Sequence, residues 1–281
     1  MRSGSHSVPA DSYASLPGRS EETIVDRQDQ DGASGADAAV STLRTVWEAQ
    51  PSSFMLSGRN DRSLVEISRQ LEVAGVTRPR LLSFGCSQGL EPLDMRRLFL
   101  HGEVHGCDVN PEALAIAAEN CRGTDILLYE SGPEAILRNG PYHGILAMNV
   151  LVNWPASYGL EEIGDLYTFE LFDRTVTTLV DALAPGGILA VYNACYCVEH
   201  TSAAPRLKPV AQPLPKDNGW VDKLDPSGRR VAIACDAKDV PITTKNWRRY
   251  MYNNAEMKPH TVRFAKLGLA DCRTILWRRI R

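Results

Sequence analysis

The chain has 281 residues, a formal net charge of −3, and 43% hydrophobic and 23% charged residues. A chain of this length and composition can bury a full core in one domain with additions. Its small net charge gives no general attraction to nucleic acids or anionic membranes. Because no apolar run approaches the roughly 18 residues needed to cross a bilayer, we expect a soluble protein with no membrane partner.

The seven cysteines are scattered along the chain. Cys195 and Cys197 are spaced too tightly to resemble a zinc knuckle or a thioredoxin-type pair. An odd number of cysteines without a framework spacing favours reduced thiols. We therefore expect a cytoplasmic protein without a metal site.

The first 35 residues are rich in Ser, Gly, Asp and Ala and contain no apolar segment of signal-peptide length. Their low hydrophobicity predicts a disordered tail. Two helices are expected next. The first is at 38–49, and the second is capped by Asp61, carries an apolar stripe of Leu64, Ile67, Leu71 and Val73, and stops at Gly75. The loop between them, at 52–60, is expected to be a packed connector; a lid over a ligand is the alternative.

Short apolar runs and helix-compatible stretches alternate from residue 79 to residue 198. Such alternation predicts a doubly wound, mostly parallel α/β sheet of the Rossmann-like type with right-handed crossovers. Asn110 followed by Pro111 predicts the start of one of its helices. The expected strands are 80–84, 104–108, 126–129, 143–149 and 188–193, and the expected helices are 91–100, 111–120, 132–138 and 168–184.

The turn after the first strand, GCSQG at 85–89, is the most informative segment. Its glycines allow the backbone to approach a ligand closely, and Asp108, at the end of the second strand, can bond the ribose hydroxyls of an adenosine-containing ligand. The middle glycine of a dinucleotide motif is missing. Glu91 would repel a diphosphate but suits a sulfonium and an ammonium group, so the pattern favours S-adenosylmethionine. The alternative is a buried turn in which Glu91 only caps or solvates the helix start.

Three motifs between residues 80 and 193 resemble known methyltransferases. GCSQGLEP at 85–92 is similar to the GCSTGEEP motif of the chemotaxis-receptor methyltransferases, and NVLVNW at 149–154 resembles their RNVLIYF segment. LAPGG at 183–187 resembles the LxPGG turn before the fifth strand of class I methyltransferases. The resemblance implies a class I fold that binds S-adenosylmethionine.

The departures from this family concern its substrate. Leu90 replaces the first glutamate of the family's motif, and Met148 replaces the arginine before Asn149. The family's helical N-terminal domain has no clear counterpart before residue 80. The match therefore indicates the cofactor better than it indicates a receptor-glutamate substrate.

Ligands of doubly wound sheets bind outside the carboxyl ends of the strands. Glu130 or Ser131, after the third strand, could bind the adenine amino group, although either could equally be a solvated turn residue. The resemblance implies that Gly85, Cys86, Glu91, Asp108, Asn149 and Val150 line the cofactor site, and the strand-end rule adds Ser87, Gly89, Val109, Glu130 and Ser131.

Methyl transfer depends mainly on alignment of the acceptor, and a base is needed only when the acceptor must lose a proton. Tyr192 and His200 follow the fifth strand and are the candidate catalytic residues, although His200 could simply be a packing or surface residue. His101, His105 and His143 lie at the opposite ends of their strands and are expected to be structural.

The region after residue 199 is rich in proline. A strand is expected at 231–235, and the Trp, Arg and Tyr residues at 246–252 suit either a substrate cap or an amphipathic helix. With a further strand at 272–277, the strand at 231–235 could complete the sheet edge in antiparallel fashion. The expected parts are a tail (1–35), N-terminal helices (36–78), the cofactor-binding core (79–198), an insertion or substrate cap (199–260), and a C-terminal helix and strand (261–281).

These patterns predict an S-adenosylmethionine-dependent methyltransferase that acts on an oxygen or nitrogen atom of a small molecule. A protein-carboxylate methyltransferase and a non-catalytic S-adenosylmethionine-binding regulatory domain remain alternatives, and a nucleotide-sugar or nicotinamide enzyme is disfavoured. No nucleic-acid partner is expected, because residues 149–152 lack the two prolines that amino-methylating DNA enzymes carry there.

Overall fold

The structure, a computed structural model, divides into two compact units at residue 39, and every residue described below belongs to the second unit. The helices expected at 38–49 and 262–267, most of the loop at 52–60, and the aromatic and arginine-rich segment at 246–252 lie outside the described residues. Those described are 58, 60–153, 164, 166–210, 221, 223–229, 234–235, 241–242 and 274–280.

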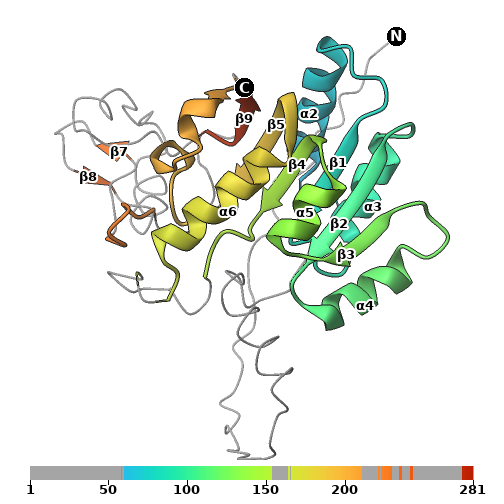
Figure 1. The fold of residues 1–281 in the computed structure, drawn as a ribbon, viewed down its shortest axis with the longest axis horizontal. Coiled ribbons are helices and arrows are strands. Elements are labelled where there is room, and N and C mark those ends of the chain that lie inside the picture. Colours follow the sequence, from blue (N-terminus) through green and yellow to red (C-terminus); the bar gives the residue numbers. More distant parts are fainter. Residues whose placement is uncertain are drawn as a thin grey trace, which may run out of the picture. The chain divides into compact units, whose positions relative to one another are not determined.

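A seven-stranded sheet forms the centre of the described chain (Figure 1). Its strands are β1 (Arg80–Phe84), β2 (Glu103–Asp108), β3 (Leu127–Glu130), β4 (Tyr142–Met148), β5 (Leu183–Tyr192), β6 (Leu207–Pro209) and β9 (Leu276–Arg279). The order is β3-β2-β1-β4-β5-β9-β6, with β1 to β5 parallel and β9 antiparallel to both of its neighbours. The strand order reverses between β1 and β4, and ligands of such sheets bind at that switch point.

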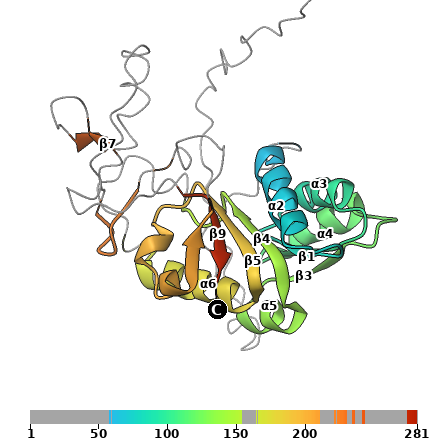
Figure 2. The ribbon, with the colours of Figure 1, turned by 90° about the horizontal axis from the view of Figure 1, so that it is seen from above.

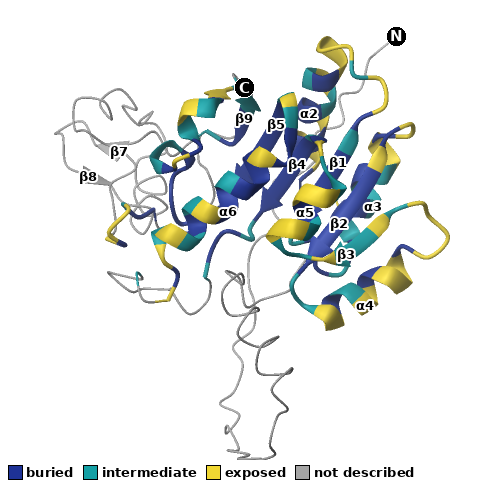
Figure 3. Ribbon diagram, viewed as in Figure 1, coloured by how far each residue is buried: buried dark blue, intermediate teal, exposed yellow. Residues whose placement is uncertain are grey.

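Helices cover both faces of the sheet (Figure 2). They are α2 (Asp61–Val73), α3 (Leu90–Leu98), α4 (Pro111–Asn120), α5 (Pro133–Asn139) and α6 (Phe169–Asp181). Successive side chains of a strand point to opposite faces, so Leu81 packs in a cluster with α2 and α3, whereas Leu82 packs in a cluster with α5 and α6. Burial on both faces makes the central strands almost continuously apolar, and Figure 3 shows these strands buried between half-exposed helices.

The predicted fold class and the parallel core elements are confirmed, each within a few residues of its expected position. At α4, the Asn110 side chain accepts hydrogen bonds from the amides of Glu112 (2.9 Å) and Ala113 (3.3 Å), as the Asn-Pro pair predicts. The cap predicted for α2 is wrong. Asp61 is the first helical residue and Asn60 takes the cap position, because the carbonyl of Asn60 already accepts from the amide of Leu64.

The predicted sheet edge is partly wrong. β9 does lie antiparallel beside β5, but the described part of the apolar run at 231–235 is β7 (Ala234–Cys235), which pairs with β8 (Pro241–Ile242) in a separate two-stranded sheet. The outermost strand of the main sheet is instead β6, whose Pro209 is tolerated because an edge strand leaves one row of amides unpaired. Apolar character alone does not reveal which sheet a strand joins.

Cys197 is disulfide-bonded, whereas Cys86, Cys107, Cys121 and Cys195 are free and buried. The prediction that all thiols are reduced is therefore wrong for Cys197, because pairing depends on the approach of two Cβ atoms in the fold and not on spacing in the sequence. Among the described helices, none is both long enough and apolar enough for a membrane crossing.

Candidate functional site

The turn between β1 and α3 lies at the carboxyl edge of the sheet, beside the switch point. Gly85, Ser87 and Gly89 all have left-handed backbone, with φ values of 74°, 48° and 82°. The amides of Gly85 and Cys86 both donate to the carbonyl of Cys107, each at 2.9 Å. The turn is therefore tied to the end of β2.

Protein contacts explain why two positions of this turn are glycine. A Cβ atom at Gly85 would lie 2.4 Å from Cγ2 of Val150, and one at Gly89 would lie 3.0 Å from Cβ of Ala117. Left-handed backbone adds a second reason at both positions. The space that a side chain at Gly85 would need thus belongs to Val150, not to a ligand, and contact between these glycines and a ligand remains a prediction.

Asp108, at the end of β2, joins the turn to the start of α4. Its side chain is only 8% exposed. One carboxylate oxygen accepts from the amide of Ser87 at 2.7 Å, and the other accepts from the amide of Asn110 at 2.9 Å. A carboxylate has about four acceptor positions, so Asp108 can hold the turn and still accept further hydrogen bonds.

Glu91 is also buried, in the first turn of α3. Its carboxylate accepts from the Ser83 hydroxyl at 2.7 Å and from the side-chain amide of Asn60. The side chain therefore links β1, α2 and α3. Neither predicted role, a contact with a cationic ligand or the capping of a helix, accounts for these bonds, and the ligand contact stays a prediction.

The end of β3 lies next to Asp108. Glu130 is exposed and stands opposite Asp108 in the β2–β3 register, and the amide of Ser131 donates to the carbonyl of Asp108 at 2.8 Å. Val109, half-buried, packs against the core cluster that includes Cys107. The structure thus brings the residues predicted for ribose and adenine to one edge.

Cys86, in contrast, points into the protein. Its side chain is fully buried, and its sulfur lies 3.1 Å from where a Cβ atom of Gly106 would stand. Burial raises the pKa of the Cys86 thiol well above its usual value. The thiol therefore stays protonated, and Cys86 can contribute to the predicted site only through its backbone.

Two asparagines with left-handed backbone follow β4 and β5. Asn149 has φ 60° and Asn193 has φ 59°. The side-chain amide of Asn193 donates to Oδ1 of Asn149 at 2.9 Å, and Oδ1 of Asn193 accepts from the amide of Val221 at 3.0 Å. The Nδ2 atom of Asn149 is buried and has no partner among the described residues. Leaving a buried donor unpaired costs about 1–3 kcal/mol, so this atom marks a place where a ligand acceptor would be favourable.

The strand-end rule keeps Asn193 as a candidate position, but the sequence assigns it no specific role. The available signal was its position directly after the fifth strand, together with the tolerance of asparagine for left-handed backbone. Its contacts with Asn149 and Val221 span 44 and 28 residues. Nothing local in the sequence predicts them.

The two candidate catalytic residues end β5 and the short helix that follows it. Tyr192 packs against the cluster that includes α2 and α3, and its carbonyl accepts from the amide of Asn149 at 2.9 Å. His200 ends the short helix η1 (Val198–His200), whose Val198 packs in the cluster with α6.

His200 has the protonation behaviour of a possible base. Its Nδ1 atom is buried and has no partner among the described residues. Burial lowers the pKa of His200, and the nearby charge of Asp225 opposes this shift only partly. The imidazole is therefore neutral near pH 7 and able to accept a proton. Whether His200 faces an acceptor is still a prediction.

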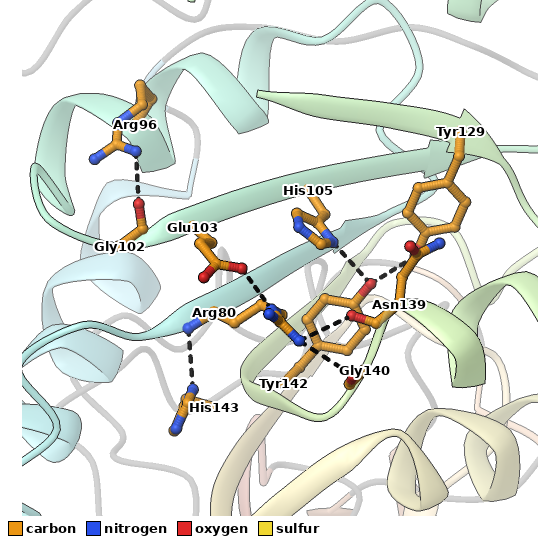
Figure 4. Close-up of polar contacts among 10 residues, drawn as sticks. All are labelled: Arg80, Arg96, Gly102, Glu103, His105, Tyr129, Asn139, Gly140, Tyr142 and His143. Atoms are coloured by element: carbon orange, nitrogen blue, oxygen red, sulfur yellow. Dashed lines mark hydrogen bonds and ion pairs between the residues drawn. The ribbon is translucent and has the colours of Figure 1, made fainter. Parts of the chain in front are cut away.

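The opposite edge of the sheet carries His105 and His143 (Figure 4). His143 accepts from the amide of Arg80 at 3.0 Å, and Nδ1 of His105 lies 3.1 Å from the Tyr142 hydroxyl. The side chain of Arg80 binds the Glu103 carboxylate at 2.7 Å. These contacts confirm that both histidines are structural and lie away from the carboxyl edge.

The seven-stranded, mostly parallel sheet between helices is consistent with the Rossmann-like fold of class I methyltransferases. No protein-family model matches the sequence, and no curated protein matches it significantly.

Several solved structures are similar to this chain at low identity. The SAM-bound amino pentose methyltransferase CalS10 of Micromonospora echinaspora is 17% identical (TM-score 0.36), with 61% of each chain covered. The plantazolicin methyltransferase BpumL, solved with SAH, is 16% identical (TM-score 0.35; 56% of this chain and 52% of that one covered). TrmN from Thermus thermophilus is 17% identical (TM-score 0.38; 57% of this chain and 45% of that one covered). This chain thus spans 45–61% of the length of these proteins, and matches at this level carry no information about its substrate.

Proposed function

We propose that the protein is an S-adenosylmethionine-dependent methyltransferase. The observation that carries the proposal is the left-handed turn at 85–89, bound through the amide of Ser87 to the buried carboxylate of Asp108. This pair lies at the carboxyl ends of β1 and β2, next to the point where the strand order reverses. A buried carboxylate with acceptor positions left is the group that an adenosine ribose requires.

The residues along this edge fit the parts of such a cofactor. Asp108 would accept from the ribose hydroxyls, and Glu130 or Ser131 would accept from the adenine amino group. The unpartnered Nδ2 of Asn149 can donate to a cofactor oxygen. A diphosphate fits less well, because the middle glycine of the dinucleotide motif is missing and Glu91 carries a negative charge near the turn. When bound, S-adenosylmethionine supplies an electrophilic methyl group.

For the acceptor we propose an oxygen or nitrogen atom of a small molecule, because no protein-docking module is evident in the sequence. Tyr192 and His200 are the proposed residues on the acceptor side. His200 would remove a proton from the acceptor, a role that its lowered pKa suits near pH 7. A protein-carboxylate substrate and a non-catalytic regulatory domain are the alternatives.

Calorimetric titration with S-adenosylmethionine, S-adenosylhomocysteine and NAD tests the cofactor. We expect the two sulfur ligands to bind and NAD not to bind. Asp108→Ala should weaken the sulfur ligands at least about tenfold, because a hydrogen bond to a charged group contributes roughly 1.5–3 kcal/mol. Asp125→Ala, which removes an exposed carboxylate, is the control and should bind like the wild type. Binding of NAD alone would refute the proposal.

Catalysis needs a separate measurement. Methyl incorporation from labelled S-adenosylmethionine, screened against small-molecule and protein fractions separately, identifies the acceptor class. Incorporation into small molecules is expected. Incorporation only into protein carboxylates would favour the second function, and tight cofactor binding without any incorporation would indicate a regulatory domain.

A further inference from the structure

The hydrogen bonds around Asn149 and Asn193 have only one possible direction. The backbone amide of Val221 can only donate, so the side-chain atom of Asn193 that it contacts must be the oxygen. The other end of the Asn193 carboxamide is therefore NH2, which can only donate, and its partner on Asn149 must be Oδ1. This series of donors and acceptors fixes the orientation of the Asn149 carboxamide and leaves its NH2 group unpaired.

The first hydrogen bond of this series, from Val221 to Asn193, is buried and supported by neighbouring contacts. Asn193 is fully buried, and Val221 is 5% exposed. Beyond Val221, the amide of Leu224 donates to the carbonyl of Cys195 at 2.9 Å, and the ammonium group of Lys223 binds the carbonyl of Ala194. The segment around Val221 is thus docked on the residues that directly follow Asn193, so the orientation of Asn193 does not depend on a single contact.

The position of Asn149 along the sheet edge indicates which part of the cofactor it meets. This step rests on the proposed function. With adenine beyond β3 and ribose beyond β2, an extended ligand continues past β1 to β4. Neighbouring strands lie about 4.8 Å apart, so the path from β3 to β4 is roughly 14 Å, comparable with an extended adenosyl amino acid. Asn149 follows β4, and Val150 beside it contacts Gly85 of the turn. The amino-acid end of the ligand therefore reaches Asn149.

We propose that Asn193 is a positioning residue that holds Asn149 as a hydrogen-bond donor to the carboxylate of the cofactor's amino-acid part. The carboxylate is the acceptor at that end of the ligand, whereas the ammonium group there could only donate. Left-handed backbone at both asparagines fits this role, because strained conformations in non-glycine residues cluster at ligand-binding positions.

The variant Asn193→Asp tests this positioning directly. The carboxylate of an aspartate can still accept from the amide of Val221, but it cannot donate to Asn149. Asn149 should then rotate its carboxamide to donate to the aspartate and present an oxygen to the ligand. We expect the affinity for S-adenosylhomocysteine to fall at least tenfold. Affinity for 5′-methylthioadenosine, which lacks the amino-acid part, should change less than twofold.

Asn149→Asp also replaces the donor that faces the ligand with an oxygen, but at a half-buried position. It is the second test if a buried aspartate at position 193 prevents folding. It keeps an acceptor for Asn193 but replaces the unpaired donor with an oxygen, so the same selective loss is expected. Asn139→Asp is the matched control. Asn139 donates its side-chain amide to the carbonyl of Ala135 near the opposite edge, and its change should leave both affinities unaltered.

A double-mutant cycle separates positioning from a general structural effect. In an Asn149→Ala background, Asn193→Asp should cause no further loss of S-adenosylhomocysteine affinity. Equal losses in both backgrounds, or equal losses for both ligands, would overturn the inference. Wild-type protein that binds neither ligand would instead refute the proposed function, so the two failures are distinguishable.

Discussion

Non-glycine residues with left-handed backbone occur at the carboxyl ends of three neighbouring strands. Ser87 follows β1, Asn149 follows β4 and Asn193 follows β5, and among the described residues these are all the non-glycine positions with positive φ. Such conformations cost about 1–2 kcal/mol per residue. The cost falls at one edge of the sheet, where ligands bind in this fold class. The backbone therefore points to the same candidate site independently of any side chain.

Gly85 should be the least replaceable residue of the turn. Gly85→Ala combines a left-handed backbone (about 1–2 kcal/mol) with a clash against Val150, for which overpacking adds about 1–3 kcal/mol. We expect a loss of about 2–5 kcal/mol in the free energy of unfolding, measured by urea denaturation. Gly123→Ala is the control, because Gly123 has φ 79° but nothing within 4 Å of the added Cβ. It should cost only the backbone contribution of about 1–2 kcal/mol.

Removing the clash should restore part of this stability. In a Val150→Ala background, the further change Gly85→Ala should cost less than in the wild type but more than Gly123→Ala does, because the Cβ atom that remains at position 150 would still lie 2.9 Å from the added Cβ. Should Gly85→Ala cost the same with and without Val150, the contact with Val150 would not be the reason for glycine at this position.

The positions of some residues of the candidate site were predictable from the sequence, and the contacts of others were not, for a definite reason. Asp108 was predictable because it ends an apolar strand next to a glycine turn, and the spacing between the two is local. Asn193 was not, because its role depends on partners 28 and 44 residues away. The fixed orientation of Asn149 follows from those contacts alone.

At the scale of elements, α4 offers a test of how helix starts support the site. Asn110 caps α4 through two amides, and its own amide binds Asp108. Asn110→Ala should lower the free energy of unfolding by about 1 kcal/mol, and Asn110→Gly should lower it by only a few tenths. Because both variants keep the backbone amide, the affinity for S-adenosylhomocysteine should change less than threefold.

Thr168→Ala provides the comparison for this cap. Thr168 caps α6 by accepting from the amide of Leu171 at 3.2 Å. Thr168→Ala should therefore also lower the free energy of unfolding by about 1 kcal/mol. A large loss of ligand affinity in Asn110→Ala, without such a loss in Thr168→Ala, would mean that the side chain of Asn110 contributes to the site and not only to the helix.

The positions of helices and strands were predictable where the local sequence pattern is strong. They were not predictable where pairing between distant segments decides which sheet a strand joins. The strands of the parallel core are apolar runs bounded by turn residues, so their positions could be read directly. The fifth strand begins earlier than expected. Leu183 already pairs with Tyr142, and the pairing shifts register before Ile188, which pairs with Gly144. Residues 184–187, expected to be a turn before the strand, are therefore an irregular part of the strand itself. The outer strand was misplaced because β6 is only three residues long.

For the whole molecule, one buried and two half-buried histidines predict a loss of stability on acidification. Burial lowers the pKa values of His105, His143 and His200 below the ordinary value of 6.5. Between that value and the lowered pKa values of the folded state, the unfolded chain binds more protons than the folded protein. Stability therefore rises with pH through this window, and falls as the pH is lowered from 7 towards 5.

Thermal denaturation at fixed ionic strength between pH 5 and pH 7.5 measures this dependence. His105→Gln should flatten the slope between pH 5 and pH 6.5, because a glutamine in place of His105 can still bond the Tyr142 hydroxyl but does not titrate. At pH 7.5, where His105 is neutral, the variant should differ from the wild type only through packing. A wild-type melting temperature that rises on acidification would contradict the lowered pKa values. It would mean that, taken together, the titrating groups bind protons more readily in the folded protein than in the unfolded chain in this pH range.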